Sequence, residues 1–139
     1  MRLVLETNVV LSGLLWRSHP RRLLELAKEE TVSLYTSSAL LDELADVLAR
    51  GKWAAMLATR HTHAAFMMQR YGVLAKVVRP QPIGRVVPND PDDDALIACA
   101  LAARADLIVS GDKHLHRLGG QYQGIPIVTP AQAVQQIAR

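Results

Sequence analysis

The chain has 139 residues, of which 50% are hydrophobic, 21% charged and 4% aromatic, and its formal net charge is +3. This composition excludes a disordered or fibrous protein and predicts a single globular domain over residues 1–139. The few aromatic residues argue against a stacking platform for single-stranded nucleic acid, whereas the mild positive charge fits a nucleic-acid partner without requiring one.

Cys99 is the single cysteine, so an intrachain disulfide is excluded, and its apolar surroundings in the sequence predict a buried, inert thiol. The sequence shows no recognisable signal peptide and no apolar run long enough for a membrane span. We therefore expect a cytoplasmic protein.

Strand-like and helix-like segments alternate along the chain. In chain order they are a strand at Arg2–Leu5, helices at Val9–Trp16 and Pro20–Lys28, a strand at Val32–Tyr35, a helix at Ala39–Ala49, one or two helices in Lys52–Tyr71, a strand at Ala75–Val78, a loop at Arg79–Asn89, a helix at Asp92–Ala103, a strand at Leu107–Val109, a helix at Lys113–Leu118, a strand at Ile125–Val128 and a helix at Pro130–Ala138. This order predicts an α/β fold with a parallel sheet and helices on both faces, which places a site at the carboxyl ends of the strands.

Acidic and polar side chains stand where these strands end or helices begin. They occupy four stretches, Leu5–Asn8, Leu41–Leu44, Asn89–Asp94 and Ser110–Asp112. Carboxylates that converge in space repel one another, and a hard divalent cation such as Mg²⁺ or Mn²⁺ relieves that repulsion. We therefore expect a metal site of the kind that supports phosphodiester cleavage.

Each stretch also has a simpler interpretation. Thr7 or Asn8 can cap the first helix, and Asp112 can cap the helix that follows it. Glu43, taken alone, is more often a solvated helix acid, although the leucines around it place it near the core-facing edge.

The loop-to-helix junction carries Asp90, Asp92, Asp93 and Asp94, four acids in five positions. Helix capping accounts for some of them, but like charges so close together oppose one another, so at least one is expected to turn inward. Asp93 and Asp94 directly precede the apolar run Ala95–Ala98, and the sequence does not separate them.

In this order and spacing the motifs resemble those of a known family. They are Val4–Val9, Glu43 in its helix, Asp90–Ala98, Asp106–Lys113 and Gly124–Pro130. The chain is similar to PIN-domain proteins, and more narrowly to VapC-like toxins of bacterial toxin–antitoxin systems, over essentially its whole length.

The resemblance implies a PIN-like three-layer αβα sandwich around a mainly parallel sheet. It also implies a metal-dependent endoribonuclease that hydrolyses RNA with Mg²⁺ or Mn²⁺, is inhibited by a cognate antitoxin protein and forms a homodimer. The family's four acids fall on Glu6, Glu43, Asp94 (or Asp93) and Asp112, and its accessory polar groups fall on Asn8 and Ser110. The metal ligands would then be Glu6, Asp94 and Asp112, with Asp93 as a further ligand or in place of Asp94. Glu43 would complete the metal shell or orient the attacking water.

One position departs from the family pattern, which opens D-x-N, because this chain has Glu6. The added methylene moves the carboxylate by roughly 1.5 Å, one C–C bond, and a misplacement of about 1 Å can cost on the order of 100-fold in rate. Whether Glu6 is native or introduced, we expect weakened rather than absent cleavage.

Two alternatives stand beside the nuclease. The first is a degenerate PIN domain that binds RNA or a protein partner without cleavage. The second is a phosphoryl-accepting receiver domain, which needs an acceptor Asp after a central strand and a Lys after a later one. No such pair is clear in this sequence.

Overall fold

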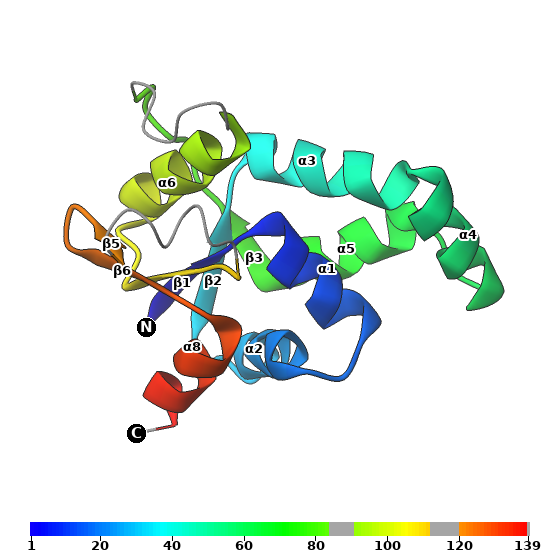
Figure 1. The fold of residues 1–139 in the computed structure, drawn as a ribbon, viewed down its shortest axis with the longest axis horizontal. Coiled ribbons are helices and arrows are strands. Elements are labelled where there is room, and N and C mark those ends of the chain that lie inside the picture. Colours follow the sequence, from blue (N-terminus) through cyan, green and yellow to red (C-terminus); the bar gives the residue numbers. More distant parts are fainter. Residues whose placement is uncertain (84–90, 112–119, 139) are drawn as a thin grey trace.

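The computed structural model describes residues 1–83, 91–111 and 120–138. Its strands are β1 (Arg2–Leu5), β2 (Ser33–Thr36), β3 (Ala75–Val77), β4 (Leu107–Val109), β5 (Gln121–Tyr122) and β6 (Ile125–Val128). Its helices are α1 (Thr7–Leu15), α2 (His19–Lys28), α3 (Ser38–Ala49), α4 (Gly51–Thr59), α5 (Ala64–Leu74), α6 (Pro91–Ala103) and α8 (Pro130–Ile137) (Figure 1).

Within the described residues the strands form one six-stranded sheet in the order β3-β2-β1-β4-β6-β5. Neighbouring strands are parallel except β5 and β6, which are antiparallel. In the register of the sheet Leu3 of β1 lies opposite Leu34 on one side and Leu107 on the other. The predicted mainly parallel sheet is confirmed, and its parallel strands all end at one edge.

Successive residues of each strand face opposite layers, as the pleat of a strand requires. Leu3 and Leu5 belong to the apolar cluster that includes residues of α1, α2 and α8, whereas Val4 packs with residues of α6. Figure 1 shows α6 above the sheet and α2 and α8 below it. The strands read as unbroken apolar runs because both faces of the sheet are covered, and the predicted three-layer sandwich is confirmed.

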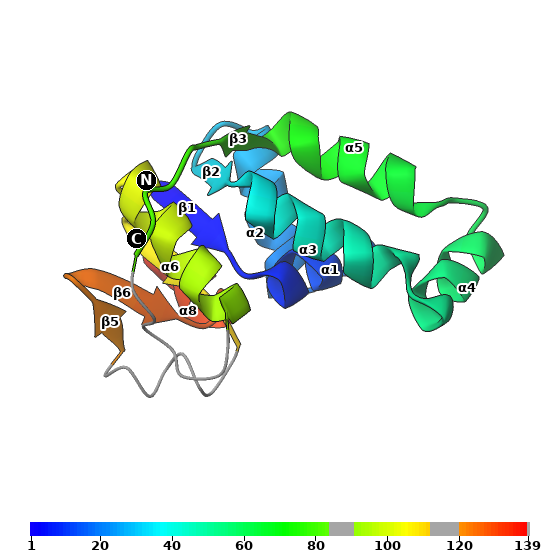
Figure 2. The same cartoon turned by 90° about the horizontal axis from the view of Figure 1, so that it is seen from above.

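The helices α3, α4 and α5 extend beyond the sheet. Figure 2 shows α3 and α5 side by side, with α4 at their far end. Ser37 caps α3, because its hydroxyl oxygen accepts a hydrogen bond from the Leu40 amide at 3.3 Å. The predicted helical region Lys52–Tyr71 is interrupted at His61, whose φ of 56° lies in the left-handed region and separates α4 from α5.

Two elements differ from the prediction. The helix α1 begins at Thr7 rather than Val9, because the Glu6 carbonyl already accepts hydrogen bonds from the amides of Val9 and Val10. The strand β5 was not predicted, since it has two residues; it forms a hairpin with β6 around Gln123 and Gly124, which both have positive φ.

The predicted helix Lys113–Leu118 and the loop positions from Gly84 to Asn89 lie outside the described residues. Among the helices that the structure describes, none has the length and apolar character needed to cross a membrane.

Candidate functional site

Glu6 and Ser110 lie together where β1 and β4 end. The two strands are parallel neighbours, and the Glu6 amide continues their pairing by donating to the Val109 carbonyl at 3.0 Å. The Ser110 hydroxyl donates to Glu6 Oε2 at 3.0 Å, while the Ser110 amide donates to the Val128 carbonyl of β6. Main-chain and side-chain contacts therefore fix this pair at the centre of the carboxyl edge of the sheet.

A pocket of about 340 Å³ opens beside Glu6. It is lined by Glu6, Asn8, Val9, Ser12, Pro20, Gly111 and Pro130. Its polar side is supplied by oxygen-bearing side chains, and its apolar side by Val9 and the two prolines. The structure thus brings Asn8 and Glu6, both predicted from the first polar stretch, to one cavity that also reaches Gly111 after β4.

The sequence pattern did not identify Ser12 as part of this site. Ser12 stands four residues after Asn8, and residues at this spacing share a face of a helix. This spacing could therefore have identified Ser12 as a residue of the site. Pro20 and Pro130 were also missed as lining residues, because each approaches the pocket from the start of a different helix.

The simpler interpretation of Thr7 and Asn8 as caps of the first helix is wrong. The cap position of α1 is Glu6, and no side chain makes the capping hydrogen bond at this helix start. Thr7 is buried, whereas Asn8 is exposed and lines the pocket. Asn8 is therefore available to contact a ligand in the pocket.

The two acids before the apolar run of α6 occupy different environments. Asp93 is buried, with 5% of its surface exposed, whereas Asp94 is partly exposed. Asp93 lies one helical turn before Leu96 and Ile97, both buried in the apolar cluster between α6 and the sheet, so it lies on the inward face of α6. The expectation that at least one acid of this junction turns inward is confirmed.

Glu43 lies on α3 and is partly exposed, while its neighbour Asp42 and also Asp46 are exposed. The helix α3 packs against both α1 and α6, the helices that carry Asn8 and Asp93. Figure 1 shows α3 beginning beside the start of α6. The fold therefore places Glu43 on a helix that adjoins the other candidate acids, and the intermediate exposure of Glu43 agrees with a position near the core-facing edge.

Asp112 lies outside the described residues, so the structure does not place the fourth predicted acid. Over residues 1–83, 91–111 and 120–138, no three His, Cys, Asp or Glu side chains gather closely enough to hold a metal ion. What the structure does bring together is Glu6, Ser110 and Asn8.

Cys99 lies on the buried face of α6 and is hydrogen-bonded to Ser37, the cap of α3. Burial raises the pKa of the Cys99 thiol from 9.0 to about 12, and the bond to Ser37 opposes this rise. The prediction of a buried cysteine is confirmed. Because a thiol of this kind stays protonated at neutral pH, it is a poor nucleophile and metal ligand.

Comparisons with known proteins agree with this fold. The sequence profile of the PIN domain matches residues 2–114. The fold matches a chain in the crystal structure of VapBC2 from Rickettsia felis bound to a DNA fragment from their promoter, with a TM-score of 0.62 and 16% sequence identity, over 91% of this chain and 97% of that chain. A comparison with curated protein sequences finds no significant match.

At this level of identity the structural likeness establishes a shared fold. The sequence profile adds the family, since its match spans well over half of the residues and includes Glu6, Glu43 and Ser110. The chain belongs to the PIN-domain family.

Proposed function

We propose that this protein is a Mg²⁺- or Mn²⁺-dependent endoribonuclease that hydrolyses RNA phosphodiester bonds. The observation that carries the proposal is the contact between the Ser110 hydroxyl and the Glu6 carboxylate, beside the pocket that Glu6 lines together with Asn8. It stands at the carboxyl edge of a parallel sheet, where ligands bind in open α/β folds. Membership of a family whose domains are generally nucleases supports the same reaction.

The side chains around the pocket suit a hard divalent cation. Glu6 and Asn8 offer carboxylate and amide oxygens, the ligand type that Mg²⁺ and Mn²⁺ prefer, and the described residues around the pocket present no thiol or imidazole. Such an ion, when bound, makes a water molecule more acidic and stabilises negative charge on a phosphate. Glu6, Asp112 and one of Asp93 and Asp94 would hold it.

The remaining polar residues would support this chemistry from fixed positions. Ser110 holds the Glu6 carboxylate in one orientation through its hydrogen bond. Glu43 would complete the metal shell or orient the attacking water. Asn8 would contact a substrate oxygen from the exposed side of the pocket.

The likeness to the VapBC2 structure supports a toxin that is paired with a cognate antitoxin, in a cytoplasmic toxin–antitoxin system. We further propose that the chain acts as a homodimer. Size-exclusion chromatography with light scattering tests the homodimer. The same measurement with the co-expressed neighbouring gene product tests the pairing with an antitoxin.

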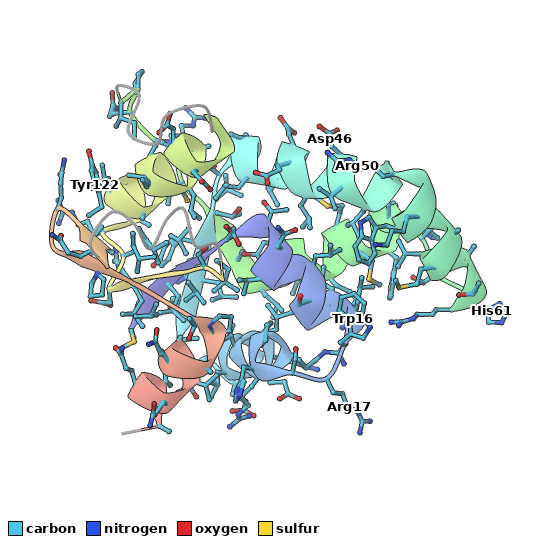
Figure 3. The ribbon with its side chains drawn as sticks, in the orientation of Figure 1. Trp16, Arg17, Asp46, Arg50, His61 and Tyr122 are labelled. Carbon is cyan, nitrogen blue, oxygen red and sulfur yellow. The ribbon has the colours of Figure 1, made fainter. Side chains whose placement is uncertain are left out.

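The decisive experiment measures cleavage of a structured RNA with Mn²⁺, with Mg²⁺ and with excess EDTA. We expect cleavage that EDTA abolishes, and activity that persists in chelator would remove the metal mechanism. Glu43→Gln should reduce cleavage by at least about 100-fold, as the loss of a general base or metal-shell group does. Asp46→Asn on the same helix is the matched control, since Asp46 lies on the outer side of α3 (Figure 3).

A second candidate function is a degenerate PIN domain that binds RNA or a protein without cutting it. Glu6 in place of the family's Asp favours it, because a displaced carboxylate can bind an ion without assembling the reacting groups. Calorimetric binding of Mn²⁺ without any turnover of RNA would support this alternative over the nuclease.

A further inference from the structure

The helix α1 has one open strip, and the strip starts at the candidate site. Of the nine residues of α1, seven are buried, and the remaining two are Asn8 and Ser12. Both line the pocket beside Glu6. Because they are one helical turn apart on one face, the pocket continues along the surface of α1.

The open strip ends at a pair of tryptophans. Trp16 caps the carboxyl end of α1 and is 40% exposed, and Figure 3 shows it at the end of the helix away from the sheet. The Trp16 and Trp53 rings pack edge to face, with centroids 5.8 Å apart and planes at 70°. From Asn8 to Trp16 the helix rises by about 12 Å, so the pair lies within reach of a polymer held at Glu6.

The two segments that carry the pair are rich in cations, although Arg22 also pairs with Glu25 and Glu29 of α2. Residues 15–22 and 50–61, which carry the two tryptophans, contain six of the chain's sixteen Lys and Arg residues and none of its thirteen Asp and Glu residues. The Lys52 ammonium lies 5.0 Å from the centre of the Trp53 ring, and Arg17 next to Trp16 extends into solvent (Figure 3). Exposed aromatic rings among cations are the combination that binds single-stranded nucleic acid.

We propose that single-stranded RNA lies along this strip of α1, with a phosphate at the Glu6 pocket and a base stacked on Trp16. Lys52 and Arg17 would contact the phosphates on either side of the stacked base. The inference rests on the proposed endoribonuclease function, and it adds the class of substrate and the direction in which the strand leaves the site. The low aromatic content argued against a stacking surface, but it did not anticipate that exposed Trp16 packs against partly buried Trp53.

The tryptophan pair supplies its own measurement, because Trp16 and Trp53 are the two tryptophans of the chain. With Mn²⁺ and the cleavage-impaired Glu43→Gln variant, an oligoadenylate of about ten nucleotides should quench the intrinsic fluorescence in a saturable way. A dinucleotide, which is too short to span the strip, and inorganic polyphosphate, which has no bases, should quench far less. Absence of quenching by the longer RNA, or equal quenching by polyphosphate, would overturn the proposal.

Substitutions test whether RNA binding depends on the tryptophan pair. Trp16→Ala should weaken RNA binding, and raise KM, by about ten-fold or more, as the loss of a stacked base does, while kcat stays near that of the unmodified protein. Trp16→Phe keeps a ring and should retain most of the binding, which separates stacking from misfolding. Phe66→Ala is the matched control, since Phe66 is 47% exposed on α5 and its ring contacts His63 rather than either tryptophan.

The outcomes separate the two proposals. If the protein cleaves RNA but Trp16→Ala leaves both KM and the RNA dissociation constant unchanged, the strip is wrong and the nuclease stands. If no metal-dependent cleavage occurs but RNA quenches the tryptophans, the strip stands and the nuclease is wrong. A fluorescence change that only a protein partner produces would overturn the RNA assignment.

Discussion

The Ser110 hydroxyl donates its hydrogen bond to the Glu6 carboxylate although the two residues are 104 positions apart in the sequence. Neither side chain could find the other without the pairing of β1 and β4, which aligns Leu5 with Val109 and leaves the next residue of each strand at the same edge. The contact therefore depends on the parallel pairing of β1 and β4, and it forms part of the candidate site.

The first prediction concerns this contact. Ser110→Ala should lower cleavage by about ten-fold, because a hydrogen bond to a charged group contributes roughly 1.5–3 kcal/mol and Glu6 loses its fixed orientation. Metal affinity, measured by Mn²⁺ titration, should fall as well. Ser38→Ala, at an exposed position of α3, should change neither quantity. Unchanged metal affinity in Ser110→Ala would show that Ser110 does not position Glu6.

A second prediction addresses the length of the side chain at position 6. Glu6→Asp should increase RNA cleavage, by up to about 100-fold, since it restores the shorter carboxylate of the family pattern. The melting temperature should change little, because the main-chain contacts of residue 6 are kept. Equal rates for the two forms would remove Glu6 as the cause of weakened activity.

The third prediction separates the two acids of α6. Asp93 is buried and faces the core side of the helix, whereas Asp94 is partly exposed. If Asp93 is the third ligand, Asp93→Asn should abolish Mn²⁺ binding and cleavage, and Asp94→Asn should reduce them only a few-fold. The reverse order in isothermal titration calorimetry would assign the role to Asp94.

A fourth prediction tests the packing that supports the pocket. A Cβ at Gly13 would come within 2.9 Å of Leu24 Cδ1 and 3.0 Å of the Pro20 carbonyl oxygen. Gly13→Ala should therefore destabilise the protein by about 1–3 kcal/mol, as overpacking does. Gly72→Ala in α5 meets nothing within 4 Å and should stabilise it by up to about 1 kcal/mol. Urea unfolding measures the change in unfolding free energy of each variant. Equal changes in the two variants would contradict the close approach of α1 to α2.

The last prediction follows from the raised pKa of Cys99. Because the folded thiol has a pKa of about 12 and the unfolded one 9.0, its contribution to stability is complete below pH 9.0 and is lost as the pH rises toward 12. Unfolding free energy should fall by up to about 1.4 kcal/mol per pH unit in that window. Cys99→Ala should remove part of this slope. A native thiol that reacts rapidly with a disulfide reagent near pH 8 would refute its burial.

The fold was predictable because its strands are buried on both faces and so appear as unbroken apolar runs. The antiparallel β5 escaped prediction because two residues carry no periodicity, although the left-handed Gln123-Gly124 turn was present as a signal. The start of α1 was placed two residues late because polar Thr7 and Asn8 obscured its apolar face.

Parts of the site depended on three-dimensional position. The sequence identified Glu6, Asn8 and Ser110 as candidates, and the fold brought them together. The sequence could not show which of Asp93 and Asp94 faces inward, since the rotation of α6 about its axis is fixed by packing. Trp16 and Trp53 stand far apart in the sequence, and their contact arises from the way α4 folds back toward the end of α1.

The main chain of Glu6 is part of the sheet and of the first turn of α1, whereas its side chain accepts the Ser110 hydrogen bond beside the pocket. On the proposed function, catalytic strength and folding would therefore be set by different atoms of the same residue. If the protein is the proposed nuclease, a lineage could attenuate or restore its potency by adding or removing one methylene group at position 6.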